Sequence, residues 1–141
     1  MQRSAQRVFL CLILAQALHS IEECVTKLYA VFAPARLVAS LVSHDLGLGF
    51  AVANAVLVSI GVWCWAVPVR LGWRTARGII WIWTIVELVN GINHSTVALL
   101  RGGYFPGVAT APLLLFFAGW LVVIQVRERP GHASDSKASV A

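Results

Sequence analysis

The sequence has few charged residues. Only 12% of its 141 residues are Asp, Glu, Lys or Arg, whereas soluble domains carry about a quarter. The hydrophobic share is 59% and the mean hydropathy is +0.79. A membrane-spanning helix takes about 20 mostly apolar residues, so four such helices with short loops use nearly the whole chain. The composition therefore predicts an all-α integral membrane four-helix bundle and leaves no room for a second domain.

The sequence also lacks paired cysteines and a basic surface. Cys11, Cys24 and Cys64 form no C-x-x-C pair and lie in apolar segments, which argues against a disulfide framework. The net charge is +5, but the basic residues lie in short loops beside apolar runs. Nucleic-acid binding calls instead for basic residues clustered on one face, so we expect no nucleic-acid partner.

The predicted spans cover about residues 8–32, 48–67, 78–100 and 108–126, within one transmembrane bundle of residues 1–126. Pro34 and Pro68 follow the first two spans and are expected to stop them. Residues 127–141 are polar and small, which predicts a disordered cytoplasmic tail. The lipid bilayer is therefore the first expected partner.

The basic residues predict the orientation of this bundle. Eight of them fall on one side of the four-span arrangement, and Lys27, Arg36 and Arg101 fall on the other. The positive-inside rule then places both termini in the cytoplasm, as in a multi-pass protein of the inner (plasma) membrane. The alternative is a signal peptide cleaved after Ala17. The apolar pattern continues through Phe32, which argues against cleavage.

Several polar residues interrupt the apolar spans. An ionisable side chain costs about 2.5–3.5 kcal/mol at the centre of a spanning helix, so it is treated as functional by default. On one helical face the first span carries Gln16, His19, Glu22, Glu23 and Thr26. The third span carries Glu87, Asn90 and His94 on one face and Asn93 on another.

These residues fall at similar depths. With a rise of 1.5 Å per residue, the polar faces of the first and third spans match Asn54 in the second, which predicts one shared layer. Glu22, Glu23 and Glu87 together would cost roughly 8–10 kcal/mol in lipid. The layer therefore needs protons, imidazolium partners or a bound cation.

The motif His19-Ser20-Ile21-Glu22-Glu23 resembles the signature of the HXXEE family of small bacterial integral membrane proteins. Two later segments resemble that family in the same order: Asn90-Gly91-Ile92-Asn93-His94, and Tyr104-Phe105-Pro106-Gly107-Val108-Ala109-Thr110. The resemblance covers roughly residues 15 to 125. It implies a membrane protein and assigns no reaction. From its residues, the Tyr104–Gly107 segment is interpreted as a turn.

Three functions are compatible with the layer. The first is a membrane-embedded acid–base enzyme on a lipid-like or apolar substrate, with Glu22, Glu23, Glu87 and Asn90 as catalytic residues. Its metal-dependent form would use His19, Glu23, Glu87 and His94 to hold Zn, Fe or Mn. The second is a proton- or cation-coupled carrier, for which four helices suggest an oligomer. The third is an accessory or assembly subunit of a membrane complex.

Overall fold

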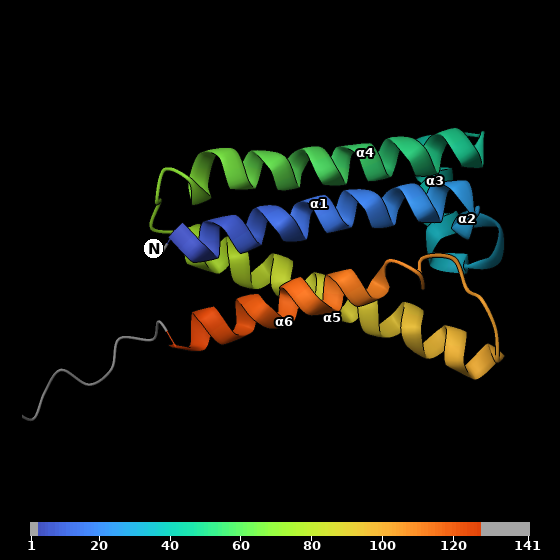
Figure 1. Ribbon diagram of the computed structural model, residues 1–141. Helices are drawn as coiled ribbons and strands as arrows, with labels where there is room; N and C mark the ends of the chain where they lie inside the picture. The colour runs from blue at the N-terminus through green and yellow to red at the C-terminus, as the bar shows by residue number, and fades with distance from the viewer. Residues whose placement is uncertain (1–2, 128–141) are drawn as a thin grey trace, which may run out of the picture.

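The computed structural model describes residues 3–127, and this part of the chain is helical with no strand (Figure 1). Its elements are α1 (Arg3–Val25), α2 (Leu28–Val31), α3 (Ala33–Val42), α4 (Leu46–Cys64), a π-helical turn (Trp65–Val69), α5 (Ala76–Arg101) and α6 (Ala111–Arg127). The expectation of an all-α chain is confirmed. The predicted disorder of the tail concerns residues that, apart from Arg127, lie outside the described part.

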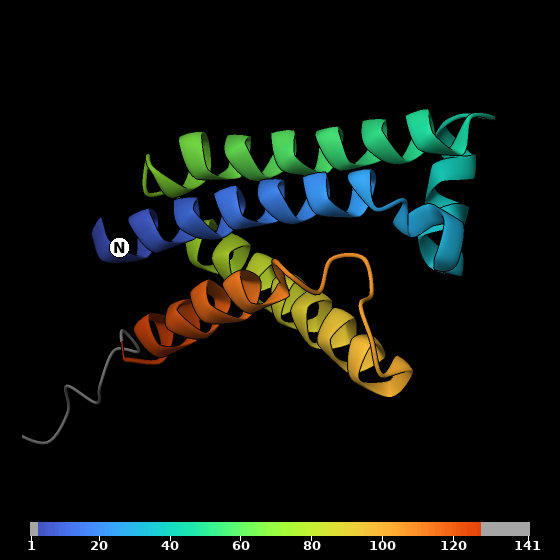
Figure 2. The same cartoon turned by 45° about the vertical axis from the view of Figure 1, so that its right-hand side comes forward.

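Helix α1 is the centre of the arrangement. It packs antiparallel to α4 and also against α6, which in turn packs against α5 (Figures 1 and 2). The short helices α2 and α3 lie at one end, where α3 packs on the start of α4. Helices α4 and α5 lie on opposite sides of α1 (Figure 1).

Two apolar clusters flank the polar residues along α1 and α5. The first is built around Phe9, Leu12, Ile80 and Leu114. The second, at the other end of the bundle, includes Phe105 together with residues of α2, α3 and α4. Along each of these two helices, the polar residues come between those that belong to the first cluster and those that belong to the second. They are thus held by packed cores on both sides.

The first predicted span, residues 8–32, is interrupted. Helix α1 ends at Val25 because Lys27 adopts a left-handed backbone conformation, with φ 56°. The Thr26 hydroxyl donates to the carbonyl of Glu22 at 2.6 Å, a back-bond of the kind that bends helices. Pro34 does not end this helix. It lies in the first turn of α3, where a missing N–H costs nothing.

The other predicted spans correspond to helices with shifted ends. The second, 48–67, begins two residues earlier at Leu46, because Asp45 caps α4 by accepting a hydrogen bond from the Leu48 amide. It continues through Pro68 in the π-helical turn. The third, 78–100, is observed as α5, which ends at a left-handed Gly102. The fourth, 108–126, is shorter and forms α6.

Two helical stretches are long and apolar enough to cross a membrane, by length and composition: Arg3–Val25 and Leu46–Val69. Helix α6 is apolar but has only 17 residues. Large apolar side chains of α4 point outward from the bundle, among them Leu48, Val56 and Trp63, which are 58%, 53% and 53% exposed.

Candidate functional site

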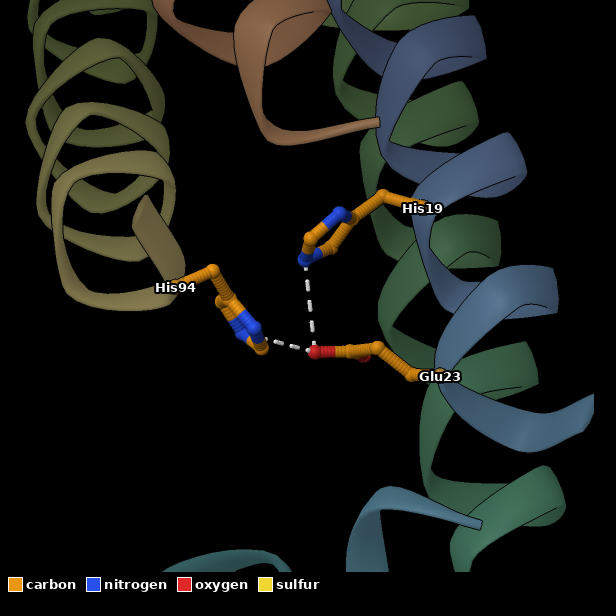
Figure 3. A group of neighbouring side chains, drawn as sticks. All are labelled: His19, Glu23 and His94. Carbon is orange, nitrogen blue, oxygen red and sulfur yellow. Dashed lines mark ion pairs between the residues drawn. The ribbon is translucent and has the colours of Figure 1, made fainter. Parts of the chain in front are cut away.

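Three buried side chains from two helices meet between the apolar clusters (Figure 3). His19 and Glu23 are one turn apart on α1, and His94 comes from α5. The Glu23 Oε1 atom lies 3.3 Å from His19 Nε2 and 3.0 Å from His94 Nε2. The two imidazole rings are edge to face, with centroids 4.7 Å apart. Within the described residues, these three side chains form a group that could hold a metal ion, because their potential ligand atoms all lie within 4.8 Å of one another.

The tautomer of His94 follows from its second partner. Its Nδ1 atom lies 2.5 Å from the carbonyl oxygen of Pro106. A carbonyl oxygen can only accept a hydrogen bond, so Nδ1 must carry a proton. In the neutral ring, Nε2 is then unprotonated and directs its lone pair at Glu23.

The tautomer of His19 follows in the same way, through Thr110. His19 Nδ1 lies 2.7 Å from Thr110 Oγ1, and that hydroxyl gives its only hydrogen to Glu22 Oε2 at 2.6 Å. Thr110 must therefore accept from His19, and Nδ1 carries the proton. The Nε2 atom of His19 is fully buried and has no hydrogen-bond partner in the described part of the chain.

Both histidines thus direct Nε2 lone pairs at one carboxylate oxygen. Three electron-rich atoms face one another with no hydrogen between them, which is unfavourable in a buried site. One or two protons, or a cation, must lie among them. Histidines that bind metals commonly hold the other ring N–H in a hydrogen bond to a carbonyl or similar acceptor, as both rings do here.

Glu22 holds the loop that sets these tautomers. Its Oε1 accepts hydrogen bonds from the Tyr104 hydroxyl at 2.6 Å and from the backbone amides of Gly107 and Ala109. Its Oε2 accepts from the amide and the hydroxyl of Thr110. Five donors saturate both oxygens. Glu22, which was predicted to be catalytic, thus holds the loop through these hydrogen bonds, and its catalytic role stays a prediction. Partial burial and the Glu22 carboxylate raise the pKa of Tyr104, so its phenol keeps the proton that it donates.

Gly107 lies where no other residue fits without movement. Its φ is +92°, in the region that favours glycine. A Cβ atom there would lie 2.5 Å from His94 Nδ1 and 2.8 Å from His19 Cε1. The loop backbone thus packs directly against both rings.

Glu87 is buried but belongs to a different hydrogen-bonded chain. In this chain Gln16 Nε2 donates to Ser20 Oγ at 3.1 Å, Ser20 donates to Asn54 Oδ1 at 2.8 Å, and Asn54 Nδ2 donates to the carbonyl of Phe50. The other amide position of Gln16 lies 2.6 Å from Glu87 Oε2.

The hydrogen-bond directions in this chain favour a neutral, protonated Glu87. Turning the Gln16 amide lets its nitrogen donate to Glu87, but its oxygen then needs the Ser20 hydrogen that Asn54 already uses. One acceptor would stay without a hydrogen. When Glu87 is instead a neutral carboxylic acid that donates to the Gln16 oxygen, every group in the chain is satisfied.

The structure brings together three of the four predicted metal ligands: His19, Glu23 and His94. Glu87 is not in that group. The first and third predicted spans, which are α1 and α5, meet as predicted through His19, Glu23 and His94. Asn90 lies within hydrogen-bonding reach of Glu87 and lines a cavity. Asn93 was assigned to a different face of its helix, yet it lines the same cavity.

Sequence reasoning missed the contribution of the loop. Pro106, Gly107 and Thr110 belong to the family-like segment, and only its Tyr104–Gly107 part was interpreted, as a turn without a link to the histidines. The sequence feature that could have indicated this contribution is a proline, a glycine and a threonine within one short segment after His94.

A cavity of about 390 Å³ borders the site. Glu23 and His94 form part of its wall, with residues of α2, α3, α4 and α5 around the rest. The buried cluster thus has one side that faces open space.

The fold and the site define a class: an all-helical chain in which apolar helices enclose a His–Glu–His cluster. The chain belongs to the family described as "protein of unknown function with HXXEE motif", whose model matches residues 10–121. The resemblance seen in the sequence is confirmed at the level of the family. In this structure the first and last residues of the motif, His19 and Glu23, belong to the cluster, and Glu22 anchors its loop. No curated protein and no solved structure matches the chain.

Proposed function

We propose that the chain is a multi-pass protein of the plasma membrane, a four-helix bundle with both termini in the cytoplasm. In this proposal His19, Glu23 and His94 bind a divalent transition metal. The bound metal forms the active centre of an acid–base enzyme that acts on a lipid-like substrate within the bilayer. The convergence of two Nε2 lone pairs on one buried carboxylate oxygen carries the proposal.

The outer surface supports the membrane part of the proposal. The helical stretch Leu46–Val69, which is α4 with the π-helical turn, is long enough to span a bilayer, and only 17% of its most apolar window is buried inside the bundle. Exposed apolar side chains on this scale mark a surface that contacts lipid or another protein. The eight-to-three distribution of basic residues supports the cytoplasmic position of the termini.

The donor set supports the metal. Two imidazoles and one carboxylate suit Zn, Fe or Mn. Three protein ligands leave a coordination position open, as catalytic rather than structural zinc sites do. Since Glu23 and His94 line the cavity, a substrate there would lie beside that position. When bound, such a metal supplies Lewis acidity and an activated water.

Metal analysis of the detergent-purified protein tests the proposal. After purification with Zn, Fe or Mn present, the wild type should hold about one ion per chain, and His19→Ala and His94→Ala should each lose it. His44→Ala, on an exposed loop position, is the matched control and should keep the ion. Circular dichroism would show that the variants are folded.

Two results would overturn the proposal. One is a folded wild type with no stoichiometric metal under any of these conditions. The other is pH-dependent flux in metal-free liposomes that Glu23→Gln abolishes, because this result would identify a proton-coupled carrier.

A further inference from the structure

The cavity beside the cluster has mixed chemistry. Its polar wall is formed by amides, among them Asn54, Asn90 and Asn93. Its remaining surface is apolar and includes Phe32, Val38 and Leu57. This combination fits a molecule with one hydrogen-bonding group and a hydrocarbon part.

No lysine or arginine contributes to the lining, in which Glu23 and His94 are the only ionisable residues. Apart from the metal proposed at these two residues, the cavity therefore offers an anionic ligand no positively charged partner. Phosphate and carboxylate groups are usually bound by arginine or lysine. Amides both donate and accept hydrogen bonds, so they match neutral carbonyl and hydroxyl groups.

One of these amides is available to a ligand. The Asn54 amide already accepts a hydrogen bond from Ser20 and donates one to the Phe50 carbonyl. Asn90 lies against Glu87. Asn93 is half-buried on the cavity wall and has no hydrogen-bond partner within residues 3–127. A polar side chain at this position would gain from a ligand that satisfies it.

The cavity is positioned for entry from the side. Residues of α1, α2, α3, α4 and α5 line it. Helices α4 and α5 lie on opposite sides of α1 and do not pack along each other (Figures 1 and 2). In the proposed membrane orientation we therefore place the entry between these two helices, facing the hydrocarbon interior. A single alkyl chain could enter there without crossing water.

We propose that this cavity binds a neutral single-chain amphiphile from the bilayer, an ester, amide or alcohol. Asn93 hydrogen-bonds its polar group, and that group lies beside Glu23 and His94. This inference rests on the proposed function, because it names the substrate class of the same site.

Native mass spectrometry of the purified protein, with 1-monooleoylglycerol as the probe and oleic acid as the anionic comparison, tests the inference. Ala53→Phe fills the cavity from α4 and should lower monooleoylglycerol binding at least tenfold. Ala55→Phe makes the same change at an exposed position outside this cavity, and it should bind as the wild type does. Asn93→Leu keeps the branched shape of the side chain, removes the amide and should weaken binding about fivefold, the equivalent of one hydrogen bond.

Metal content, measured in parallel, separates the two proposals. All three variants should keep the ion, which also shows that they are folded. Wild-type affinity in Ala53→Phe would overturn the cavity as the binding site, and stronger binding of oleic acid than of monooleoylglycerol would overturn the neutral ligand class. Neither result would touch the metal site. A wild type without metal would instead remove the proposed function, whatever the probe does.

Discussion

Thr110 joins the loop to the site, and its replacement by valine is the sharpest test of the tautomer argument. The side chains are almost isosteric, so packing should change little. The substitution removes the hydroxyl that accepts from His19 Nδ1 at 2.7 Å and donates to Glu22 Oε2 at 2.6 Å. His19 then has a buried N–H without a partner, and its ring is free to change tautomer.

The substitution should have two separate effects. Leaving a buried donor unsatisfied lowers the free energy of unfolding by about 1–3 kcal/mol. Loss of an outer-shell partner of a metal-bound histidine typically lowers metal affinity 10–100-fold, which corresponds to about 1.4–2.8 kcal/mol. We therefore expect Thr110→Val to raise the Kd for the metal by one to two orders of magnitude.

The assay is competition for Zn between the detergent-purified protein and a chelating dye. Thr110→Ser keeps the hydroxyl and should stay within a few-fold of the wild type. Thr96→Val makes the same change at an exposed position of α5 and should have no effect. Wild-type affinity in Thr110→Val would refute the assignment of Thr110 as the residue that orients His19.

Two further predictions concern the neighbours of the cluster. Gly107→Ala would push both imidazole rings and strain a positive φ, so metal affinity should fall more than tenfold; Gly103→Ala, with no atom within 4 Å of the added Cβ, should bind normally in the same assay. Glu87→Gln should change the free energy of unfolding by less than about 1 kcal/mol, because a neutral amide can donate to Gln16 as the neutral acid does, whereas Glu87→Leu should lower it by about 1–3 kcal/mol. A thermal or denaturant melt in detergent that ranks Gln with Leu would show that Glu87 is ionised.

The polar layer could be predicted from the sequence because it depends on helical periodicity. His19 and Glu23 are four residues apart and must share a face, and a buried face is the only one that suits them in an apolar helix. Matching the depths of His94 and His19 then required only the rise per residue. Regular helical geometry is therefore enough to predict the polar layer.

The loop could not be predicted in the same way. Its path depends on a left-handed turn at Gly107 and on five hydrogen bonds that converge on Glu22 from the loop. Nothing in the spacing of Glu22 shows that its partners lie more than 80 residues away. Glu22 and Glu23 are adjacent in sequence, yet the 100° turn between them sends one to the loop and the other to the cluster. Residue type alone could not show that the two glutamates have different partners.

The three carboxylates of the layer have three different surroundings. The sum of their formal charges favours a divalent ion. Glu22 keeps its charge because five donors surround it, Glu87 fits its network as a neutral acid, and Glu23 faces two imidazoles. Glu22 and Glu23 then carry two formal negative charges, because the five donors stabilise the charge of Glu22 without neutralising it. Two protons on the histidines would balance them, but would place two imidazolium rings 4.7 Å apart in a buried site. One divalent cation gives the same neutrality at a single point between all three donors, and it uses the lone pairs that the protonated rings would lose.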